Sequence, residues 1–213
     1  TEFRVAEEAQ LAGVGMGGRD EQAHRALMAQ TGEVELFRTD VAQRVAVGKL
    51  WNAGQTCVAP DFMFLPKGKT PEFIEKFKAC VLEMYPHFKD NQDDTAIIND
   101  KQYQRLQNYL DDAQTHGAQI IEINPLHEQL SDVRKIAPTL VAGVTPDVRI
   151  LLNEIFGPLL PIMEYEQIDD VIDFINSRPR PLALYYFDFD QARAEYVAQR
   201  THSGHFGQNT VLT

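Results

Sequence analysis

The stretch DFMFLPKGKTPEFIEKFKACVLEM, residues 61–84, places a short apolar segment directly before an amphipathic one. The apolar run DFMFLP predicts a buried strand. In the second segment Pro71 suits the first turn of a helix with Thr70 as its N-cap, and apolar side chains recur at helical spacing as far as Met84. A buried strand followed by a helix is the unit from which α/β proteins are built, so this stretch predicts an α/β fold.

The same alternation continues on both sides of this stretch. The predicted strand LALYYF, residues 182–187, is apolar throughout, which suits a sheet covered by helices on both faces. No internal repeat, low-complexity tract or long Gly/Ser linker divides the chain, so we predict one compact domain over residues 1–213. The other predicted strands are 33–37, 118–123, 136–144, 147–152 and 159–165, and the other predicted helices are 20–30, 40–51, 100–116 (capped by Asn99), 168–177 and 190–200.

The composition argues against several classes of partner. The net charge is −11, from 31 Asp and Glu against 20 Lys and Arg. Such a chain repels phosphate backbones and anionic lipid surfaces, so we expect no nucleic acid and no membrane among its partners. No apolar run approaches the roughly 20 residues that span a bilayer, and the N-terminus lacks the order of a signal peptide. These features predict a cytoplasmic protein.

The two cysteines lie in different settings. In a cytoplasmic protein both are expected to be free thiols. Cys80 shares a helix face with Phe73, Phe77 and Val81, which predicts a buried core residue. Cys57 lies in the loop segment NAGQTCVAP, residues 52–60, beside polar neighbours. It is either a reactive loop thiol or a small buried residue in a turn, and spacing alone leaves both interpretations open.

Glycines near the N-terminus raise the possibility of a nucleotide site. Gly13, Gly15 and Gly18 have the G-x-G-x-x-G spacing of a dinucleotide-binding loop. Such a loop needs a hydrophobic strand before its first glycine, and only Leu11 and Ala12 stand there. We therefore expect the spacing to be accidental and nucleotide affinity at this loop to be low.

Other chemistry-bearing residues are few. His202 and His205 form an H-x-x-H pair, but the segment is rich in glycine and lacks a third ligand, so we predict no metal site. Glu154 follows the predicted strand 147–152 and precedes a Phe-Gly-Pro turn. Because ligands bind at the carboxyl ends of α/β strands, Glu154 is a candidate binding residue, with a solvated surface acid as the alternative.

Two segments together carry a resemblance to a known family. NAGQTCVAP at 52–60 and NEIFGPLLPI at 153–162 resemble, in that order, the catalytic domain of the NAD(P)-dependent aldehyde dehydrogenase superfamily, most closely its coniferyl-aldehyde and fatty-aldehyde branch. The resemblance extends from about Val41 to the C-terminus, where RTHSGHFGQNT resembles the family's ending strand. Residues 1–40 match poorly. The resemblance implies a three-layer α/β/α catalytic domain with a mostly parallel sheet.

The resemblance also implies a chemistry. Cys57 would be the catalytic nucleophile that attacks a small-molecule aldehyde, with its backbone N–H as an oxyanion donor. Glu154 would hold the nicotinamide ribose hydroxyls of NAD or NADP, and Phe156 would pack beside the ring. The product would be an acid, released from a thioester on Cys57. Asn52 belongs to the first motif, and we expect it to have a structural role.

Departures from the family pattern qualify these expectations. The family's cofactor-binding domain would precede residue 1, and the chain stops at Thr213 before the family's final loop and strand. Gly15 falls where the family's general base belongs, and Glu33 or Glu35 are the candidates to replace it. An alternative function is therefore a catalytically impaired relative that acts as a binding or regulatory module. A homo-oligomer, or pairing with a cofactor-binding domain, is compatible with either function.

Overall fold

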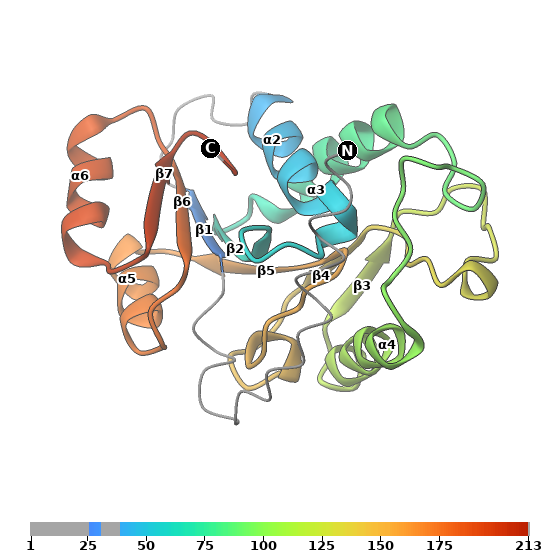
Figure 1. The fold of residues 1–213 in the computed structure, drawn as a ribbon. Coiled ribbons are helices and arrows are strands. Elements are labelled where there is room, and N and C mark those ends of the chain that lie inside the picture. The colour runs from blue at the N-terminus through green and yellow to red at the C-terminus, as the bar shows by residue number, and fades with distance from the viewer. Residues whose placement is uncertain (1–25, 31–38, 213) are drawn as a thin grey trace.

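The computed structural model describes residues 26–30 and 39–212 (Figure 1). In this part of the chain the strands form one sheet in the order β3-β4-β5-β2-β1-β6-β7. Neighbouring strands are parallel except β3 and β4, which are antiparallel. The predicted mostly parallel α/β fold is confirmed. The strands are β1 (Ala26–Gln30), β2 (Pro60–Pro66), β3 (Gln119–Glu122), β4 (Thr139–Ala142), β5 (Leu159–Tyr165), β6 (Ala183–Phe187) and β7 (His205–Gln208).

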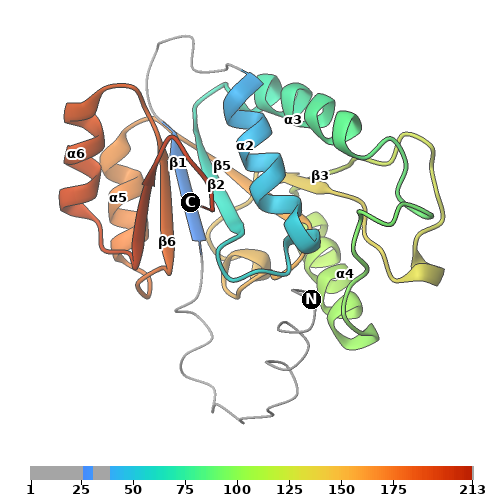
Figure 2. The same cartoon turned by 45° about the horizontal axis from the view of Figure 1, so that its top comes forward.

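Helices cover both faces of this sheet. In Figures 1 and 2, α2 and α3 lie together on one face, and Figure 1 shows α4 and α5 on the other. The core is divided accordingly, because side chains alternate across a strand: Phe62 and Phe64 of β2 join one buried cluster with α4, α5 and α6, whereas Met63 and Leu65 join the other with α2 and α3. The helices are α2 (Thr39–Leu50), α3 (Thr70–Met84), α4 (Asp100–Thr115), α5 (Ile168–Asn176) and α6 (Gln191–Arg200), with short 3₁₀ helices η1 (Trp51–Gly54), η2 (Ser131–Val133) and η3 (Arg149–Leu151).

Local signals placed most helices correctly. Asn99 caps α4, as predicted, and its side chain accepts the Gln102 N–H at 2.9 Å. The N-cap prediction for α3 is wrong by one position, because the helix begins at Thr70 itself after Lys69.

Two predicted elements are wrong. The predicted helix 20–30 is contradicted over Ala26–Gln30, which form β1 in the middle of the sheet, paired with β2 and β6. Pairing on both sides outweighs the local helical pattern there. The predicted strand 147–152 contains η3 instead, and its apolar residues Ile150 and Leu151 are buried by a single turn. The predicted strand 33–37 and the glycine loop 13–18 lie outside the described residues.

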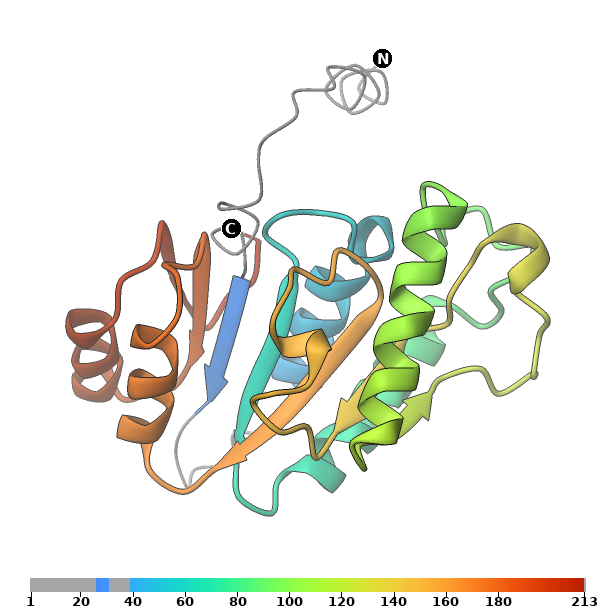
Figure 3. The ribbon, with the colours of Figure 1, turned by 90° about the horizontal axis from the view of Figure 1, so that it is seen from below.

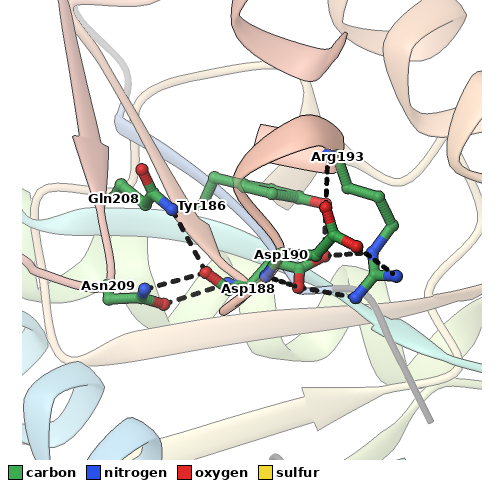
Figure 4. Close-up of polar contacts among 6 residues, drawn as sticks. All are labelled: Tyr186, Asp188, Asp190, Arg193, Gln208 and Asn209. Carbon is green, nitrogen blue, oxygen red and sulfur yellow. Dashed lines mark hydrogen bonds and ion pairs between the residues drawn. The ribbon is translucent and has the colours of Figure 1, made fainter. Parts of the chain in front are cut away.

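The buried carboxylate of Asp188 connects β6 to α6, and the Asp188 backbone binds the residue after β7, at the edge of the sheet formed by β6 and β7 (Figure 4). Asp188 follows β6, and its side chain accepts hydrogen bonds from the Tyr186 hydroxyl at 3.0 Å and from the Arg193 guanidinium at 2.6 and 2.8 Å. Its backbone N–H donates to Asn209 Oδ1 at 2.9 Å, and its carbonyl accepts Asn209 Nδ2 at 2.8 Å. These contacts join the end of β6 to the start of α6 and to the residue after β7, so they fix the C-terminal strand to the sheet.

Candidate active site

Cys57 lies in an exposed turn between η1 and β2, whereas Cys80 is buried on α3. The exposed position of Cys57 excludes the interpretation of a small buried residue in a turn. Burial raises the pKa of the Cys80 thiol, as expected for a core cysteine. The exposed thiol is therefore the one that solvent and a substrate can reach.

The turn before Cys57 is built from consecutive left-handed residues. Asn52, Ala53 and Gly54 have φ values of 52°, 52° and 71°. Asn52 accepts the Gln55 backbone N–H at 3.0 Å through its carbonyl, and its side-chain amide donates to the Gln55 carbonyl at 3.2 Å. Asparagine tolerates the left-handed region better than most residues. These contacts agree with the structural role expected for Asn52.

Gln55 connects this turn to a distant segment. Its side-chain amide donates to the Ala96 carbonyl at 3.1 Å and accepts the Ile98 N–H at 2.9 Å. Only 9% of Gln55 is exposed. The buried amide thus pairs with the backbone of the segment before α4 and holds the Cys57 turn against it.

Tyr185 of β6 supports the same turn from within the sheet. Its hydroxyl donates to the Val58 carbonyl at 2.9 Å. Burial raises the pKa of Tyr185, and this effect outweighs the backbone hydrogen bond at Leu212, which lowers it. Tyr185 therefore stays a neutral hydrogen-bond donor to the residue that follows Cys57.

The second candidate segment, Glu154–Gly157, precedes β5. The expectation that Glu154 follows a strand is wrong, because η3 stands before it and the strand comes after it. Cys57 likewise precedes β2, so both segments lie at the amino edge of the parallel strands, and in Figure 3 the arrows of β2 and β5 point away from these loops. Glu154 and Phe156 are half-buried, and Phe156 has a left-handed φ of 48°.

The two segments touch through their glycines. A Cβ atom added to Gly54 would lie 2.3 Å from the carbonyl oxygen of Gly157, and one added to Gly157 would lie 2.6 Å from Leu106 of α4. Glycine is required at position 54, because its φ is positive and an added side chain would meet backbone atoms; at position 157 an added side chain would instead meet the Leu106 side chain. The structure thus brings the Cys57 turn and the Glu154–Gly157 loop together, as the pair of sequence motifs implied.

Two residues that the sequence did not single out hold the Glu154–Gly157 loop. Asp61, near the start of β2 and 3% exposed, accepts the Ile155 N–H at 2.8 Å. Arg105 of α4 donates to the carbonyls of Glu154 at 2.9 Å and Ile155 at 2.6 Å. An acid inside an otherwise apolar strand was a usable signal for Asp61. Arg105 had none, because it lies in a polar helix far along the chain.

The histidine pair lies on the surface of the described part of the chain. His202 and His205 are both exposed, and His205 begins β7 with its ring centroid 6.4 Å from that of Tyr185. Among residues 26–30 and 39–212, no three His, Cys, Asp or Glu side chains are grouped so that they could hold a metal ion. Within the same ranges, no helix is long and apolar enough to cross a membrane.

The fold and the two loops define an α/β domain with an exposed cysteine beside a carboxylate-bearing loop. Residues 37–213 match the model of the aldehyde dehydrogenase family, and the chain belongs to that family. It is 48% identical over 176 residues to the coniferyl aldehyde dehydrogenase of a Pseudomonas species, strain HR199, which covers 82% of this chain and 37% of that protein. A probable coniferyl aldehyde dehydrogenase of Pseudomonas aeruginosa is 44% identical over 81% of this chain and 36% of its own length. The predicted likeness to the coniferyl-aldehyde branch is confirmed.

Solved structures agree with this assignment. The substrate-bound AldH of Staphylococcus aureus is 33% identical and superposes with a TM-score of 0.80, over 90% of this chain and 40% of that chain. An oxidoreductase from Marinobacter aquaeolei, 27% identical, gives a TM-score of 0.76 over 88% of this chain and 39% of that chain. The three-layer catalytic-domain fold is therefore confirmed. The chain spans little more than a third of the length of the curated relatives it matches.

Proposed function

We propose that residues 1–213 form the catalytic domain of an NAD(P)-dependent aldehyde dehydrogenase that oxidises an aldehyde to an acid, with Cys57 as the nucleophile. The observation that carries the proposal is the contact between the exposed Cys57 turn and the Glu154–Gly157 loop through Gly54 and Gly157. Family membership and the names of the coniferyl aldehyde dehydrogenase relatives support it.

The chemistry begins at the exposed thiol. The Cys57 thiolate adds to the carbonyl carbon of the aldehyde and forms a carbon–sulfur bond, while negative charge develops on the oxygen and is stabilised by the Cys57 backbone N–H. A bound NAD⁺ or NADP⁺ would supply the hydride acceptor, and loss of hydride from the former carbonyl carbon would leave an acyl thioester on Cys57. Water then attacks the acyl carbon, the acid departs, and Cys57 recovers its thiolate.

The residues at the amino edge fit the nicotinamide end of the cofactor. The half-buried Glu154 carboxylate supplies acceptors for ribose hydroxyls, and the half-buried Phe156 supplies an aromatic surface. Gly54 keeps a side chain out of the space where the loops meet, and Gly157 leaves room for the Leu106 side chain of α4. Hydrolysis of the thioester needs a general base, for which we propose Glu33 or Glu35; both lie outside the described residues.

Partners and location complete the proposal. The substrate is a small-molecule aldehyde, and the amino edge pairs with a cofactor-binding domain or with a further copy of the chain. One relative, from mouse, is named as a dimeric enzyme. A cytoplasmic location is supported by the free state of both cysteines.

Acyl capture by Cys57 tests this function directly. The chain is incubated with cinnamyl-type and medium-chain aliphatic aldehydes and with NAD⁺ or NADP⁺, and the Cys57 peptide is then examined by mass spectrometry for a thioester. We expect the acylated Cys57 peptide to accumulate without steady turnover by the chain alone; the adduct should be lost in Cys57→Ser and retained in the matched variant Cys80→Ala. Acid formation that survives in Cys57→Ser would refute the proposal. If Cys57 reacts with iodoacetamide but is never acylated in the presence of aldehyde and cofactor, the result would favour the regulatory module.

A further inference from the structure

We propose that Arg105 is a positioning residue that sets the backbone conformation of the Glu154–Phe156 segment and thereby aims the two side chains assigned to the cofactor. The inference rests on the proposed function, which assigns roles to Glu154 and Phe156. It adds a residue of α4, outside the two sequence motifs, that binds the backbone carbonyls of Glu154 and Ile155.

The Arg105 guanidinium reaches two consecutive carbonyls. Nη1 donates to the Glu154 oxygen at 2.9 Å and Nη2 to the Ile155 oxygen at 2.6 Å. The fork of the guanidinium is itself held, because Nε donates to Gln102 Oε1 at 2.5 Å and Nη1 also donates to the Tyr109 hydroxyl at 3.2 Å. Hydrogen bonds from a charged donor are stronger than neutral ones, and a planar fork fixes direction as well as distance.

The Ile155 residue is consequently held from both sides. Its carbonyl is bound by Arg105, and its N–H donates to the buried Asp61 carboxylate of β2 at 2.8 Å. Glu154 precedes this fixed residue and Phe156 follows it. The directions of both side chains are therefore set by α4 and β2 rather than by their own contacts alone.

Phe156 shows why such support is needed. Its φ of 48° lies in the left-handed region, which an aromatic residue adopts only when its surroundings enforce it. The following residue, Gly157, is confined between Leu106 of α4 and Gly54 of the Cys57 turn. Without the two Arg105 hydrogen bonds the segment can relax toward ordinary backbone angles, and Glu154 and Phe156 would then turn away from their positions.

Amide hydrogen exchange measures this restraint without any cofactor. In Arg105→Gln we expect the amides of residues 154–156 to exchange about tenfold faster or more, because two charge-assisted hydrogen bonds to the segment are lost. Arg105→Lys, which supplies one ammonium instead of a fork, should lie between this variant and the wild type. Circular dichroism and thermal unfolding establish that each variant folds.

Arg178 provides the matched control. This α5-flanking arginine donates to the carbonyls of Leu151 at 2.6 Å and Pro146 at 3.2 Å, so it braces the chain just before the Glu154–Phe156 segment. Arg178→Gln should speed exchange around residues 146–152 and leave residues 154–156 unchanged. If Arg105→Gln leaves the 154–156 amides as protected as in the wild type, or if Arg178→Gln exposes them equally, the inference is overturned.

Kinetics then separate positioning from mere stabilisation. With an aldehyde deuterated at the carbonyl carbon, Arg105→Gln should raise the cofactor KM and the isotope effect on kcat, because hydride transfer becomes slower relative to other steps. The aldehyde KM and the alkylation rate of Cys57 should stay unchanged. An unaltered isotope effect and cofactor KM would overturn the positioning role. Absence of turnover and of a Cys57 thioester in the wild type would instead count against the proposed function, while the exchange experiment still decides on Arg105.

Discussion

Replacing Gly54 by alanine perturbs the contact between the Cys57 turn and the Glu154–Gly157 loop without changing either reactive side chain. Gly54 has a φ of +71°, and an added Cβ would meet the Gly157 carbonyl oxygen at 2.3 Å and the Lys49 carbonyl oxygen at 2.9 Å. Both neighbours are backbone atoms, so neither can yield by a change of rotamer. The methyl group must therefore push the Cys57 turn away from the Glu154–Gly157 loop.

The expected cost has two parts. A residue with a side chain in the left-handed region costs about 1–2 kcal/mol, and forcing extra volume into a packed site costs about 1–3 kcal/mol more. Gly68 and Gly143 supply the control, since their φ values are +79° and +73° and an added Cβ would meet nothing within 4 Å. Alanine at either control position has only the cost of the left-handed backbone, so Gly54→Ala should be about 1–3 kcal/mol less stable than the controls.

Thermal unfolding followed by circular dichroism at pH 7 gives the comparison. For a chain of this size, 1 kcal/mol lowers Tm by about 2–4 °C, so Gly54→Ala should unfold about 2–12 °C below Gly68→Ala and Gly143→Ala. The rate of Cys57 alkylation should also change in Gly54→Ala alone. If all three variants unfold at the same temperature, the two loops do not pack against each other as described and the reasoning fails.

Two further predictions concern the buried carboxylate of Asp61 and the largely buried carboxylate of Asp94. Asp61→Ala leaves the Ile155 N–H buried without its acceptor, so urea unfolding should show a loss of about 1–3 kcal/mol, and a loss below about 0.5 kcal/mol would contradict the assigned bond. Burial raises the pKa of Asp94 from 3.8 to about 6 despite Lys135 nearby, so the folded chain binds this proton more tightly than the unfolded chain. Protonated Asp94 therefore stabilises the fold fully below about pH 4, and this stabilisation is lost as the pH rises through about 6. Relative to the wild type, the free energy of unfolding of Asp94→Asn should rise by up to about 2–3 kcal/mol between about pH 4 and 7. Parallel curves of unfolding free energy against pH for the two proteins would contradict this.

How much of the fold the sequence predicts depends on how local its signals are. The helix α4 was located from its Asn99 cap and its spacing, because both act within a few residues. The strand β1 was missed because Ala26–Gln30 read locally as part of a helix and become a strand only through pairing with β2 and β6, which lie far along the chain. The run 147–152 failed for a related reason, since a short apolar segment is buried equally well by a strand or by a 3₁₀ turn.

The candidate site divides in the same way. The two motifs around Cys57 and Glu154 were visible in the sequence, and their proximity was implied by resemblance. Their position at the amino edge of the sheet was not predicted, because it depends on whether the strand precedes or follows each loop in the chain. Arg105 could not be found from sequence, since a single arginine on a polar helix gives no sign that its guanidinium reaches a loop on another element.

The contacts that hold the site have one property in common: each ends on a backbone group. Arg105 binds carbonyls, Asp61 binds an N–H, and Tyr185 binds the carbonyl of Val58. The side chains of Cys57 and Glu154 can therefore be exchanged without loosening these contacts, whereas a change in α4, β2 or β6 moves the loops and leaves the reactive groups chemically intact. Loss of chemistry and loss of geometry are thus separable at the Glu154–Gly157 loop: variants of Arg105 and Asp61 should alter cofactor-dependent steps and leave the intrinsic reactivity of the Cys57 thiol unchanged.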